Sequence, residues 1–376
     1  MSTERQRIHQ MMKKAIREAE KARGLCSPNP FVGAVIAKDD RIIASGHTQA
    51  YGSDHAEVQA LKKAGKRAKG ADLFVTLEPC SHHGKTPPCT DAIIQAGIKR
   101  VFFGIRDPNP LVNCDIDTPG PGIISMREAG IQVEWGFLKE QISRQLEYFL
   151  CRIQKDRPFV ILKSALSMDG KYAAADGSSR WISNQSSRIY THKLRQEVDV
   201  MLVGISTVLK DDPLLTVRLP RIKRQPLRAV LDAYLDIPLD SALIKSIDTA
   251  PLLVVHSHAS DATIQSKAAV LRGLGVRLAC VDSQNELLDL RQALGVLHEL
   301  GYYSVMLESA GPLAAAFINQ QLVDKLIIFY GAKLLGGLHS ALADLDIANI
   351  DSALELQSTE VRDLDGDLML SAYPRY

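Results

Sequence analysis

The sequence is poor in cysteine, which excludes one class of protein. Six cysteines are spread over 376 residues, at positions 26, 80, 89, 114, 151 and 280. Small secreted domains held together by disulfides carry cysteine at a much higher density. We therefore expect reduced thiols and a cytoplasmic enzyme.

Long apolar runs are also missing. No stretch approaches the ~18 apolar residues that a helix needs to cross a bilayer. The first residues, MSTERQRIHQMMKK, contain no apolar core, so we expect no secretory signal. The sequence thus predicts no membrane partner.

A charge excess of either sign is absent. Forty-five Lys and Arg residues stand against 43 Asp and Glu residues, which gives a net charge of +2 at pH 7. Because no block of like charges stands out, the composition predicts no nucleic-acid partner. A G-x-G-x-x-G motif is missing too, which argues against a Rossmann domain.

The hydrophobic pattern predicts an α/β protein of two domains. The first half alternates helices and strands, which is typical of a layered sheet with helices on its faces. A polar helix over 139–158 runs into Lys-Asp-Arg-Pro, and the pattern restarts after it. We therefore predict domains at 1–150 and 156–376.

The expected elements can be stated by residue range. In the first half we expect helices near 5–22, 55–66 and 88–96, and strands at 31–37, 41–45, 73–77 and 100–105. In the second half we expect strands at 159–165, 199–204, 228–232, 252–256, 276–280, 304–308 and 325–331, and helices near 183–197, 287–300 and 312–321.

Metal-binding chemistry is concentrated in the first half. His55 offers an imidazole, and Cys80 and Cys89 offer two thiols. Three protein ligands leave the fourth tetrahedral position of Zn²⁺ to a water, whereas structural zinc sites are closed by four. Glu57 lies two residues from His55, and its carboxylate can carry a proton from that water to a leaving amine. The set predicts a zinc-dependent deaminase with Glu57 as its catalytic residue.

Local sequence supports a helix start at the second cysteine. In Thr86-Pro87-Pro88-Cys89 the Thr is a candidate helix cap, and Pro87 is suited to the first helical position. Cys89 would then lie in the first turn, where the positive helix end favours a thiolate.

Each motif has a simpler interpretation when taken alone. An H-x-E triplet occurs by chance, and two cysteines in a cytosolic chain are usually small buried hydrophobes. Their combination matches the H-x-E…P-C-x-x-C signature of zinc nucleobase deaminases, except that eight residues separate the cysteines here. Between them, His82 and His83 are either spare metal ligands or polar loop residues.

The segment LEPCSHHGKTPPC, residues 77–89, resembles the bifunctional deaminase/reductase family of riboflavin biosynthesis. The second half resembles the reductase part of that family in the same motif order: RPFVILKSA from 157, SMDGK from 167, SRWIS from 179, TVLKDDPLLTVR from 207 and ESAGPL from 308. The resemblance implies a cytidine-deaminase-like three-layer domain followed by a dihydrofolate-reductase-like domain.

The resemblance also implies site residues, beyond the zinc ligands and Glu57. Each has an alternative without a binding role. Asn29 and Asn109 can simply stabilise turns, a lone Arg is usually a solvated cation, and a Trp usually lies in the core. For the substrate, the implied residues are Asn29, Lys85, Asp107, Asn109, Ser179, Arg195, Leu215, Arg218 and Glu308. For the nicotinamide cofactor, they are Ala165, Trp181, Thr207, Asp211, Ala310, Gly311 and Pro312.

Physical arguments support some of these assignments. Glu308 ends an apolar strand and precedes a Gly-Pro turn into a helix, whose N-terminus suits a dinucleotide phosphate. Arg195 and Arg218 are cations that can hold a phosphate through two hydrogen bonds. Trp181 offers a flat aromatic surface to a cofactor.

Two successive reactions on one small molecule follow from the resemblance. Zinc-dependent deamination of 2,5-diamino-6-ribosylamino-4(3H)-pyrimidinone 5′-phosphate would be followed by NADPH-dependent reduction of the ribosyl group to ribityl. Zn²⁺ and NADPH are thus the expected cofactors, and a homo-oligomer, dimer or tetramer, is the expected assembly. The sequence itself shows no preference for NADPH over NADH.

One segment departs from the family pattern, and two rival hypotheses remain. The link from Leu111 to Gly122 is longer and more acidic than in the family, and its Cys114 is a weak candidate for a fourth zinc ligand. One rival is a transfer-RNA deaminase with an accessory domain, which has the same zinc signature. The other is a closed structural zinc site without catalysis.

Overall fold

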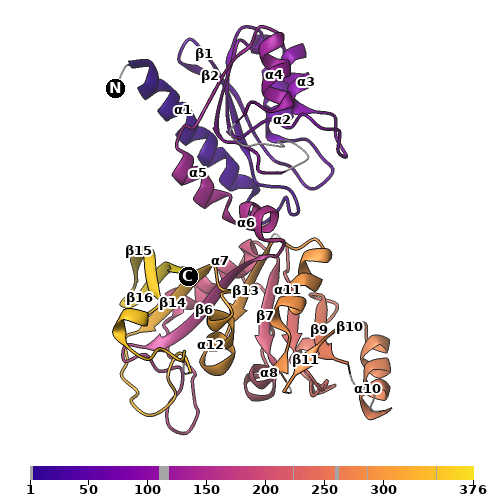
Figure 1. Ribbon diagram of the computed structural model, residues 1–376, viewed down its shortest axis with the longest axis vertical. Helices are drawn as coiled ribbons and strands as arrows, with labels where there is room; N and C mark the ends of the chain where they lie inside the picture. The colour runs from indigo at the N-terminus through magenta and orange to yellow at the C-terminus, as the bar shows by residue number, and fades with distance from the viewer. Residues whose placement is uncertain (1–2, 110–117, 223, 259–261, 286, 344) are drawn as a thin grey trace. The chain divides into compact units, whose positions relative to one another are not determined.

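The computed structural model describes residues 3–109, 118–222, 224–258, 262–285, 287–343 and 345–376. The chain divides into two compact units, Met1–Asp156 and Arg157–Tyr376. In Figure 1 the first unit runs from indigo to magenta and the second from pink to yellow.

The first unit is built on a five-stranded sheet of order β2-β1-β3-β4-β5. β1 pairs antiparallel with β2 and β3, whereas β3, β4 and β5 are parallel. β3 is buried along its whole length, as its apolar sequence predicts. The strands are β1 (Gly33–Lys38), β2 (Arg41–His47), β3 (Asp72–Leu77), β4 (Arg100–Ile105) and β5 (Gln132–Trp135).

Helices cover both faces of this sheet and make three layers. A Cβ added at Gly33 would lie 2.0 Å from the Ala15 carbonyl oxygen of α1, and one at Gly46 would lie 2.3 Å from the Ala56 oxygen of α2. Since Gly46 pairs with Ala34, the neighbour of Gly33, the two glycines face opposite sides of the sheet. The helices are α1 (Thr3–Ala19), α2 (Ala56–Ala64), α3 (Cys89–Gln95), α4 (Pro121–Glu128), α5 (Lys139–Gln145) and α6 (Glu147–Lys155), with short 3₁₀ turns at Glu20–Ala22 and Gly65–Ala68.

The second unit is built on a nine-stranded sheet of order β10-β9-β8-β7-β13-β6-β14-β16-β15. The pairs from β10 to β14 are parallel, and β16 and β15 continue the sheet antiparallel. The strands are β6 (Phe159–Ser167), β7 (Val200–Gly204), β8 (Leu227–Leu231), β9 (Leu252–Ser257), β10 (Arg277–Val281), β13 (Ser304–Glu308), β14 (Lys325–Gly331), β15 (Glu355–Leu364) and β16 (Asp367–Arg375), and a separate small ribbon joins β11 (Ser283–Gln284) to β12 (Leu287–Leu288).

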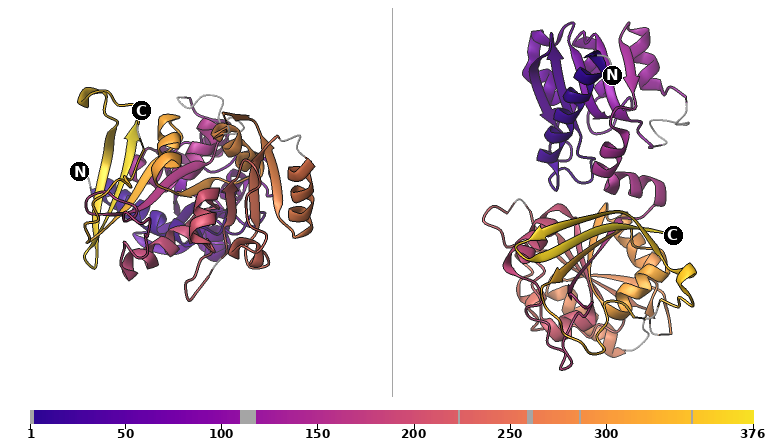
Figure 2. Two further views of the ribbon diagram at one scale, coloured as in Figure 1. Left: turned by 90° about the horizontal axis from the view of Figure 1, so that it is seen from below. Right: turned by 90° about the vertical axis from the view of Figure 1, so that its left-hand side faces the viewer.

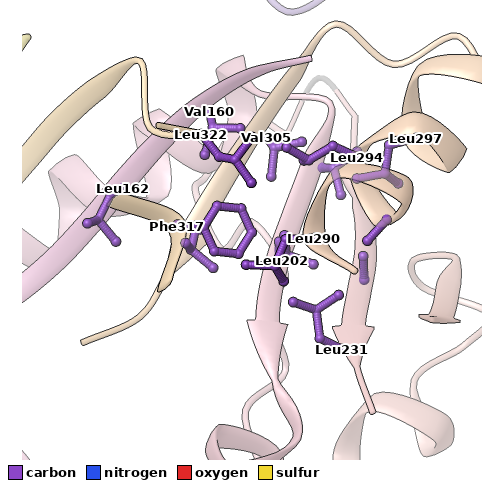
Figure 3. Close-up of a cluster of buried hydrophobic side chains, with 14 of the residues drawn as sticks. Val160, Leu162, Leu202, Leu231, Leu290, Leu294, Leu297, Val305, Phe317 and Leu322 are labelled. Atoms are coloured by element: carbon purple, nitrogen blue, oxygen red, sulfur yellow. The ribbon is translucent and has the colours of Figure 1, made fainter. Parts of the chain in front are cut away.

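The core of the second unit joins the central strands to two helices. Figure 3 shows Leu202 and Val305 of the strands against Phe317 of α12 and Leu294 of α11. These side chains are fully buried, so the packing fixes the strand ends that carry the predicted site. The helices are α7 (Gln185–Glu197), α8 (Ile205–Asp211), α9 (Ala242–Lys245), α10 (Ala262–Gly273), α11 (Leu290–Glu299) and α12 (Gly311–Asn319), with a 3₁₀ turn at Ile350–Ser352.

The C-terminal hairpin forms one edge of this sheet, drawn in yellow in Figure 2. Nine of the ten residues of β15 are exposed, whereas β16 alternates buried and half-buried residues. Figure 1 shows the same two strands beside β14. The hairpin was not among the elements expected from the sequence.

The predicted α/β class is confirmed, and two element predictions need correction. The helix expected over 139–158 is two helices, because the backbone turns out of helical geometry at Leu146. The helix expected from 287 begins at Leu290, since Leu287–Leu288 pair as β12 and Asp289 caps the helix. α4, β5, α8, α9 and α10 were not predicted from the sequence. No helix within the described ranges is long and apolar enough to cross a membrane.

Candidate functional site

Three element ends of the first unit meet at one point. His55 is the N-cap residue of α2, and Cys89 is the first residue of α3. Cys80 follows β3 by three residues, just beyond the carboxyl end of the buried strand. Cys80 and Cys89 follow His55 in the sequence by 25 and 34 residues, and the fold brings both into contact with it.

The three side chains have the geometry of a zinc site. The Nδ1 atom of His55 lies 3.5 Å from the Cys80 Sγ and 3.3 Å from the Cys89 Sγ. All three ligand atoms lie within 4.8 Å of one another. Tetrahedral zinc with usual Zn–N and Zn–S bonds would hold such atoms about 3.6 Å apart. The donor set therefore fits Zn²⁺ with one coordination position left for a non-protein ligand.

The two thiols differ in charge because of their surroundings. The hydrogen bond from the Cys89 thiol and the contact with His55 together lower the pKa of Cys80 to about 4, against the effect of burial. The Cys89 pKa is raised by the same hydrogen bond and by burial. The hydrogen bond to Cys80 raises the His55 pKa to about 9. A thiolate is thus already favoured at Cys80, and a bound cation would favour the second one.

Glu57 lies in the first turn of α2 and is only 4% exposed. Burial, and then the Cys80 thiolate, raise the pKa of its carboxyl group to about 7. A bound Zn²⁺ opposes this effect, since a nearby positive charge favours the carboxylate. Glu57 is therefore placed beside the ligands, with a proton affinity suited to proton transfer near neutral pH.

The prediction that Thr86 caps the third helix is wrong. α3 begins at Cys89, and Pro88 occupies the N-cap position without a side-chain hydrogen bond. The Cys89 backbone N–H donates instead to the Cys80 Sγ, at 3.4 Å. The zinc ligand thus takes the place of the expected hydroxyl cap.

A pocket of about 200 Å³ opens beside the ligands. The Lys85 ammonium group lies over the Tyr51 ring, 4.2 Å from its centre. His82 lines this pocket, and its buried Nδ1 atom has no hydrogen-bond partner among the described residues. The lining residues are Asn29, Tyr51, Gly52, Ser53, His55, Cys80, His82, Gly84, Lys85 and Thr86.

Asp107 is buried and is not among these lining residues. Its carboxylate accepts a hydrogen bond from the Asn109 N–H at 2.9 Å, and its own N–H donates to Glu78, which forms a buried ion pair with Arg106. Burial raises the pKa of Asp107 to about 6. The atypical link that follows, including Cys114, lies outside the described residues from 110 to 117.

Charged side chains gather at the carboxyl ends of the central strands in the second unit. Glu308 ends β13, and the Arg195 guanidinium of α7 binds its two carboxylate oxygens at 2.9 and 3.0 Å. The Lys163 ammonium of β6 lies 3.8 Å from the same carboxylate. Burial raises the pKa of Glu308, but Arg195 and Lys163 outweigh it and bring the pKa to about 2.

Arg218 adds a further cation to this cluster. Its guanidinium forms no hydrogen bond or ion pair with the described residues, whereas Arg195 is fully engaged by Glu308 and the Thr216 carbonyl. Burial, and then Arg195, lower the pKa of Arg218. Neighbouring cations with one unpaired guanidinium make a binding place for an anion.

Known proteins match the chain over almost its whole length. Residues 5–105 match the cytidine and deoxycytidylate deaminase zinc-binding region, and residues 158–370 match the RibD C-terminal domain. The riboflavin biosynthesis protein RibD of Aquifex aeolicus is 40% identical over 96% of this chain and 96% of its own length. This chain belongs to the RibD family.

Solved structures agree with this assignment. RibD of Acinetobacter baumannii has a TM-score of 0.86 and 33% identity, with coverage of 99% of this chain and 100% of that one. A diaminohydroxyphosphoribosylaminopyrimidine deaminase/5-amino-6-(5-phosphoribosylamino)uracil reductase of Thermotoga maritima has a TM-score of 0.85 and 34% identity, with the same coverage. Both predicted folds, deaminase-like and reductase-like, are therefore confirmed.

Family membership decides between the hypotheses raised by the sequence. The chain is a bifunctional deaminase and reductase of riboflavin biosynthesis, with a zinc-binding deaminase domain and an NADPH-dependent reductase domain. Neither the transfer-RNA deaminase nor a closed structural zinc protein accounts for a RibD C-terminal domain over residues 158–370.

The residues expected to bind the cofactor lie around the same strand ends. Thr207 and Asp211 belong to α8, which follows β7, and Gly311 and Pro312 begin α12, which follows β13. A Cβ at Gly204, before α8, would lie 3.0 Å from Leu313 of α12, so the two helix starts are adjacent. This is the edge at which parallel sheets bind phosphates and nucleotides, so the arrangement fits NADPH.

The remaining residues expected at the reductase site lie on other elements of the second unit. Ala165 lies on β6 opposite Phe329, and Leu215 is buried in the irregular segment that also carries Arg218. Ser179 and Trp181 lie in a loop before α7, where Trp181 is 59% exposed and has the Arg188 guanidinium 4.6 Å from its ring centre. Ala310 is the N-cap residue of α12.

The structure draws attention to two residues that the sequence did not single out. Lys163 was read as part of a motif only; its signal is a lysine inside an otherwise apolar strand. His82 was left between two interpretations, and no local pattern separates a loop histidine from a pocket histidine. The N–H of Gly311, expected to be free for a phosphate, donates to the Ala341 carbonyl at 2.8 Å.

Proposed function

We propose that the two sites act in turn on one pyrimidine ribose-phosphate, first by deamination of the ring and then by reduction of the ribosyl group to ribityl. We assign the first reaction to residues 1–150 and the second to residues 156–376. The two compact units and the two activities for which the Thermotoga maritima relative is named support this proposal.

In the deaminase site, His55, Cys80 and Cys89 would hold Zn²⁺. When bound, the ion supplies a water of lowered pKa as the nucleophile. The Glu57 carboxylate takes a proton from the attacking water and delivers it to the departing amino group, so that ammonia leaves and a carbonyl remains. Its burial keeps bulk water from competing for that proton.

The deaminase pocket supplies groups that recognise a polar, anionic substrate. Asn29 offers an amide to the pyrimidine edge, and Lys85 offers a cation for the phosphate. We add His82 to these substrate contacts, because its Nδ1 faces no protein partner. Asp107 and Asn109 support the pocket wall through their short turn.

In the reductase site, NADPH supplies the hydride when bound. Glu308 and Lys163 present a carboxylate and an ammonium 3.8 Å apart, a pair that suits hydroxyl groups of a ribose. Arg218 is the better candidate for the phosphate, since the Arg195 guanidinium is already used to hold Glu308. Arg195 thus orients the carboxylate. Ser179 and Leu215 complete the substrate contacts.

The cofactor contacts follow from the adjacent helix starts. Thr207 and Asp211 of α8 would bind the cofactor through their polar side chains, and Gly311 and Pro312 at the start of α12 would lie against it. Ala165 would lie along the cofactor on β6, Ala310 at the start of α12, and Trp181 would cover it with an exposed indole.

We propose a homo-oligomer, dimer or tetramer. The exposed edge strand β15 supports it, because Leu356 and Val361 on that strand are 44% and 59% exposed and an unpaired strand edge readily accepts a second strand. Light scattering on the purified protein tests this, and a monomer at micromolar concentration would overturn it.

We further propose a cytoplasmic enzyme that acts on a free nucleotide and not on nucleic acid. Zinc binding needs Cys80 and Cys89 as thiolates, and a reducing compartment preserves them. The pocket of about 200 Å³ suits one pyrimidine nucleotide. Deamination of RNA without activity on the free pyrimidine would contradict this proposal.

The convergence of His55, Cys80 and Cys89 beside the buried Glu57 carries the proposal. Its test follows ammonia release and NADPH oxidation with the purified protein and the diaminopyrimidinone ribose-phosphate. We expect ammonia without NADPH, and NADPH oxidation only after ammonia release. Oxidation of NADPH before any deamination would overturn the proposed order.

A further inference from the structure

A buried arginine of the second unit is tied to the segment that carries Leu215 and Arg218. Arg228 lies on β8 and has a relative exposure of 0%. No carboxylate of the described residues pairs with it, and burial lowers its pKa only to about 10, so it is charged at neutral pH. A buried cation without a counter-charge costs several kcal/mol unless hydrogen bonds replace its hydration.

The hydrogen bonds of the Arg228 side chain go to two segments, the one that contains Leu214 and the turn from Ser246 to Ala250. One guanidinium nitrogen donates to the Leu214 carbonyl at 3.3 Å and to the Ser246 hydroxyl at 2.7 Å. The other donates to the Ser246 carbonyl at 3.2 Å and to the Ala250 carbonyl. An apolar side chain of the same volume would fill this space at lower cost, but it would remove the guanidinium donor from the Leu214 and Ala250 carbonyls.

The Leu214 contact matters because residues 212–218, here called the substrate segment, have no regular structure. Side chains from other parts of the unit donate hydrogen bonds to its backbone carbonyls, as neighbouring strands do in a sheet. Arg195 donates to the Thr216 carbonyl at 3.2 Å, and Gln225 donates to the Val217 carbonyl at 3.1 Å. Arg228 holds the third carbonyl.

We propose that Arg228 is a positioning residue of the reductase reaction, which sets the conformation of the substrate segment through the Leu214 carbonyl and so places Leu215 and Arg218. The inference rests on the proposed role of that segment in substrate binding. Arg228 is fully buried and acts on the segment through the Leu214 carbonyl, whereas Arg195 acts through the Thr216 carbonyl, so the two arginines link the segment to β8 and to Glu308.

The decisive variant is Arg228→Met, which keeps the length of the side chain and removes every donor. We expect the KM for the pyrimidine in the reductase step to rise about tenfold, with the KM for NADPH and the rate of deamination unchanged. Arg228→Lys, which keeps one cationic donor group, should recover part of the loss.

Arg157→Met is the matched control. Arg157 is another largely buried arginine of this unit, and it binds Asp324 at 2.6 and 2.9 Å. It lies just before the amino end of β6, whereas Glu308 lies at the carboxyl end of the neighbouring parallel strand β13. The control should lower the melting temperature without raising the KM for the pyrimidine. Hydrogen exchange should increase over residues 212–218 in Arg228→Met and not in Arg157→Met.

A double variant separates this inference from the proposed function. If Arg228 acts through the segment, Arg218→Ala should raise the KM for the pyrimidine, and Arg228→Met should add little in that background. An unchanged KM in Arg218→Ala would overturn the role of the segment itself. An effect of Arg218→Ala with none from Arg228→Met, or full additivity, would overturn the positioning role alone.

Discussion

His192 illustrates how position decides the behaviour of a single residue. Burial, and then the neighbouring cations Arg195 and Arg218, lower the pKa of this histidine to about 4 from an ordinary value of 6.5, while Glu308 acts in the opposite direction. Its Nδ1 atom accepts a hydrogen bond from the Arg218 N–H at 3.4 Å. The imidazole is therefore neutral at physiological pH and acts as an acceptor.

The lowered pKa predicts a pH dependence of stability. The unfolded state binds a proton at His192 below pH 6.5 and the folded state does so only near pH 4, so this contribution is complete above pH 6.5 and is lost as the pH falls toward 4. Between pH 7 and pH 4.5 the wild type should lose on the order of 2 kcal/mol more than His192→Asn. Urea unfolding at both pH values measures the free energy of unfolding. An equal loss of this free energy in both proteins would contradict the prediction.

Glu57 is the proposed proton carrier of the deaminase site. Glu57→Gln keeps the shape of the side chain and removes its ability to accept a proton, so deamination should fall by about 10³-fold. Zinc content, measured by atomic emission, and reduction of the deaminated pyrimidine should be unchanged.

Glu18→Gln is the control for Glu57→Gln. Glu18 is a buried glutamate of the same unit, paired with Lys21 and His47, and its replacement should leave turnover unaffected. Full deaminase activity in Glu57→Gln would contradict the assignment of Glu57 as the catalytic residue.

Contact between elements sets the position of the deaminase residues. The β2 strand approaches the start of α2 so closely that a Cβ at Gly46 would lie 2.3 Å from the Ala56 carbonyl oxygen and 2.6 Å from the Ala60 nitrogen. Both neighbours are helix backbone, which cannot turn aside as a side chain can. The helix that carries Glu57 thus packs directly against the strand backbone at Gly46, where the strand has no side chain.

Gly46→Ala should therefore move α2 as a whole. We expect a loss of at least about 2 kcal/mol in the free energy of unfolding, and a deaminase rate reduced more than tenfold, because both His55 and Glu57 shift with the helix. Gly295→Ala is the matched control, since nothing lies within 4 Å of a Cβ at that helical position. It should stabilise by about 0.5–1 kcal/mol. A normal deaminase rate in Gly46→Ala would show that the helix tolerates the displacement.

At the scale of the whole molecule, each unit has its own sheet and its own compact set of contacts. The proposed zinc ligands all belong to the first unit, and the Glu308 cluster belongs to the second. Zinc binds the folded first unit and contributes its binding energy to that unit.

Removal of zinc should consequently affect the two activities unequally. Chelation should abolish deamination and lower the melting temperature of one calorimetric transition, while NADPH-dependent reduction of the deaminated pyrimidine continues. Addition of Zn²⁺ should restore both lost properties. If chelation stops reduction as completely as deamination, the two sites are not independent.

The amino-acid sequence by itself determined the chemistry of the first site and most of its local structure. An imidazole, two thiols and a nearby carboxylate limit the metal and the reaction whatever their arrangement. Helices and strands with strong apolar periodicity were predictable because that signal is local. The weakly apolar β5 and the exposed β15 carried no such signal.

Only the tertiary structure decided which distant residues meet. Lys163 and Glu308 are 145 positions apart in sequence and become neighbours because β6 and β13 pair in parallel. Likewise Arg228 reaches Leu214 only once β8 is placed in the sheet. Parallel pairing joins strands through long crossovers, and side-chain periodicity holds no record of which strands will be joined. For that reason the zinc ligands could be predicted from the sequence, whereas the contacts of Lys163 and Arg228 in the reductase unit could not.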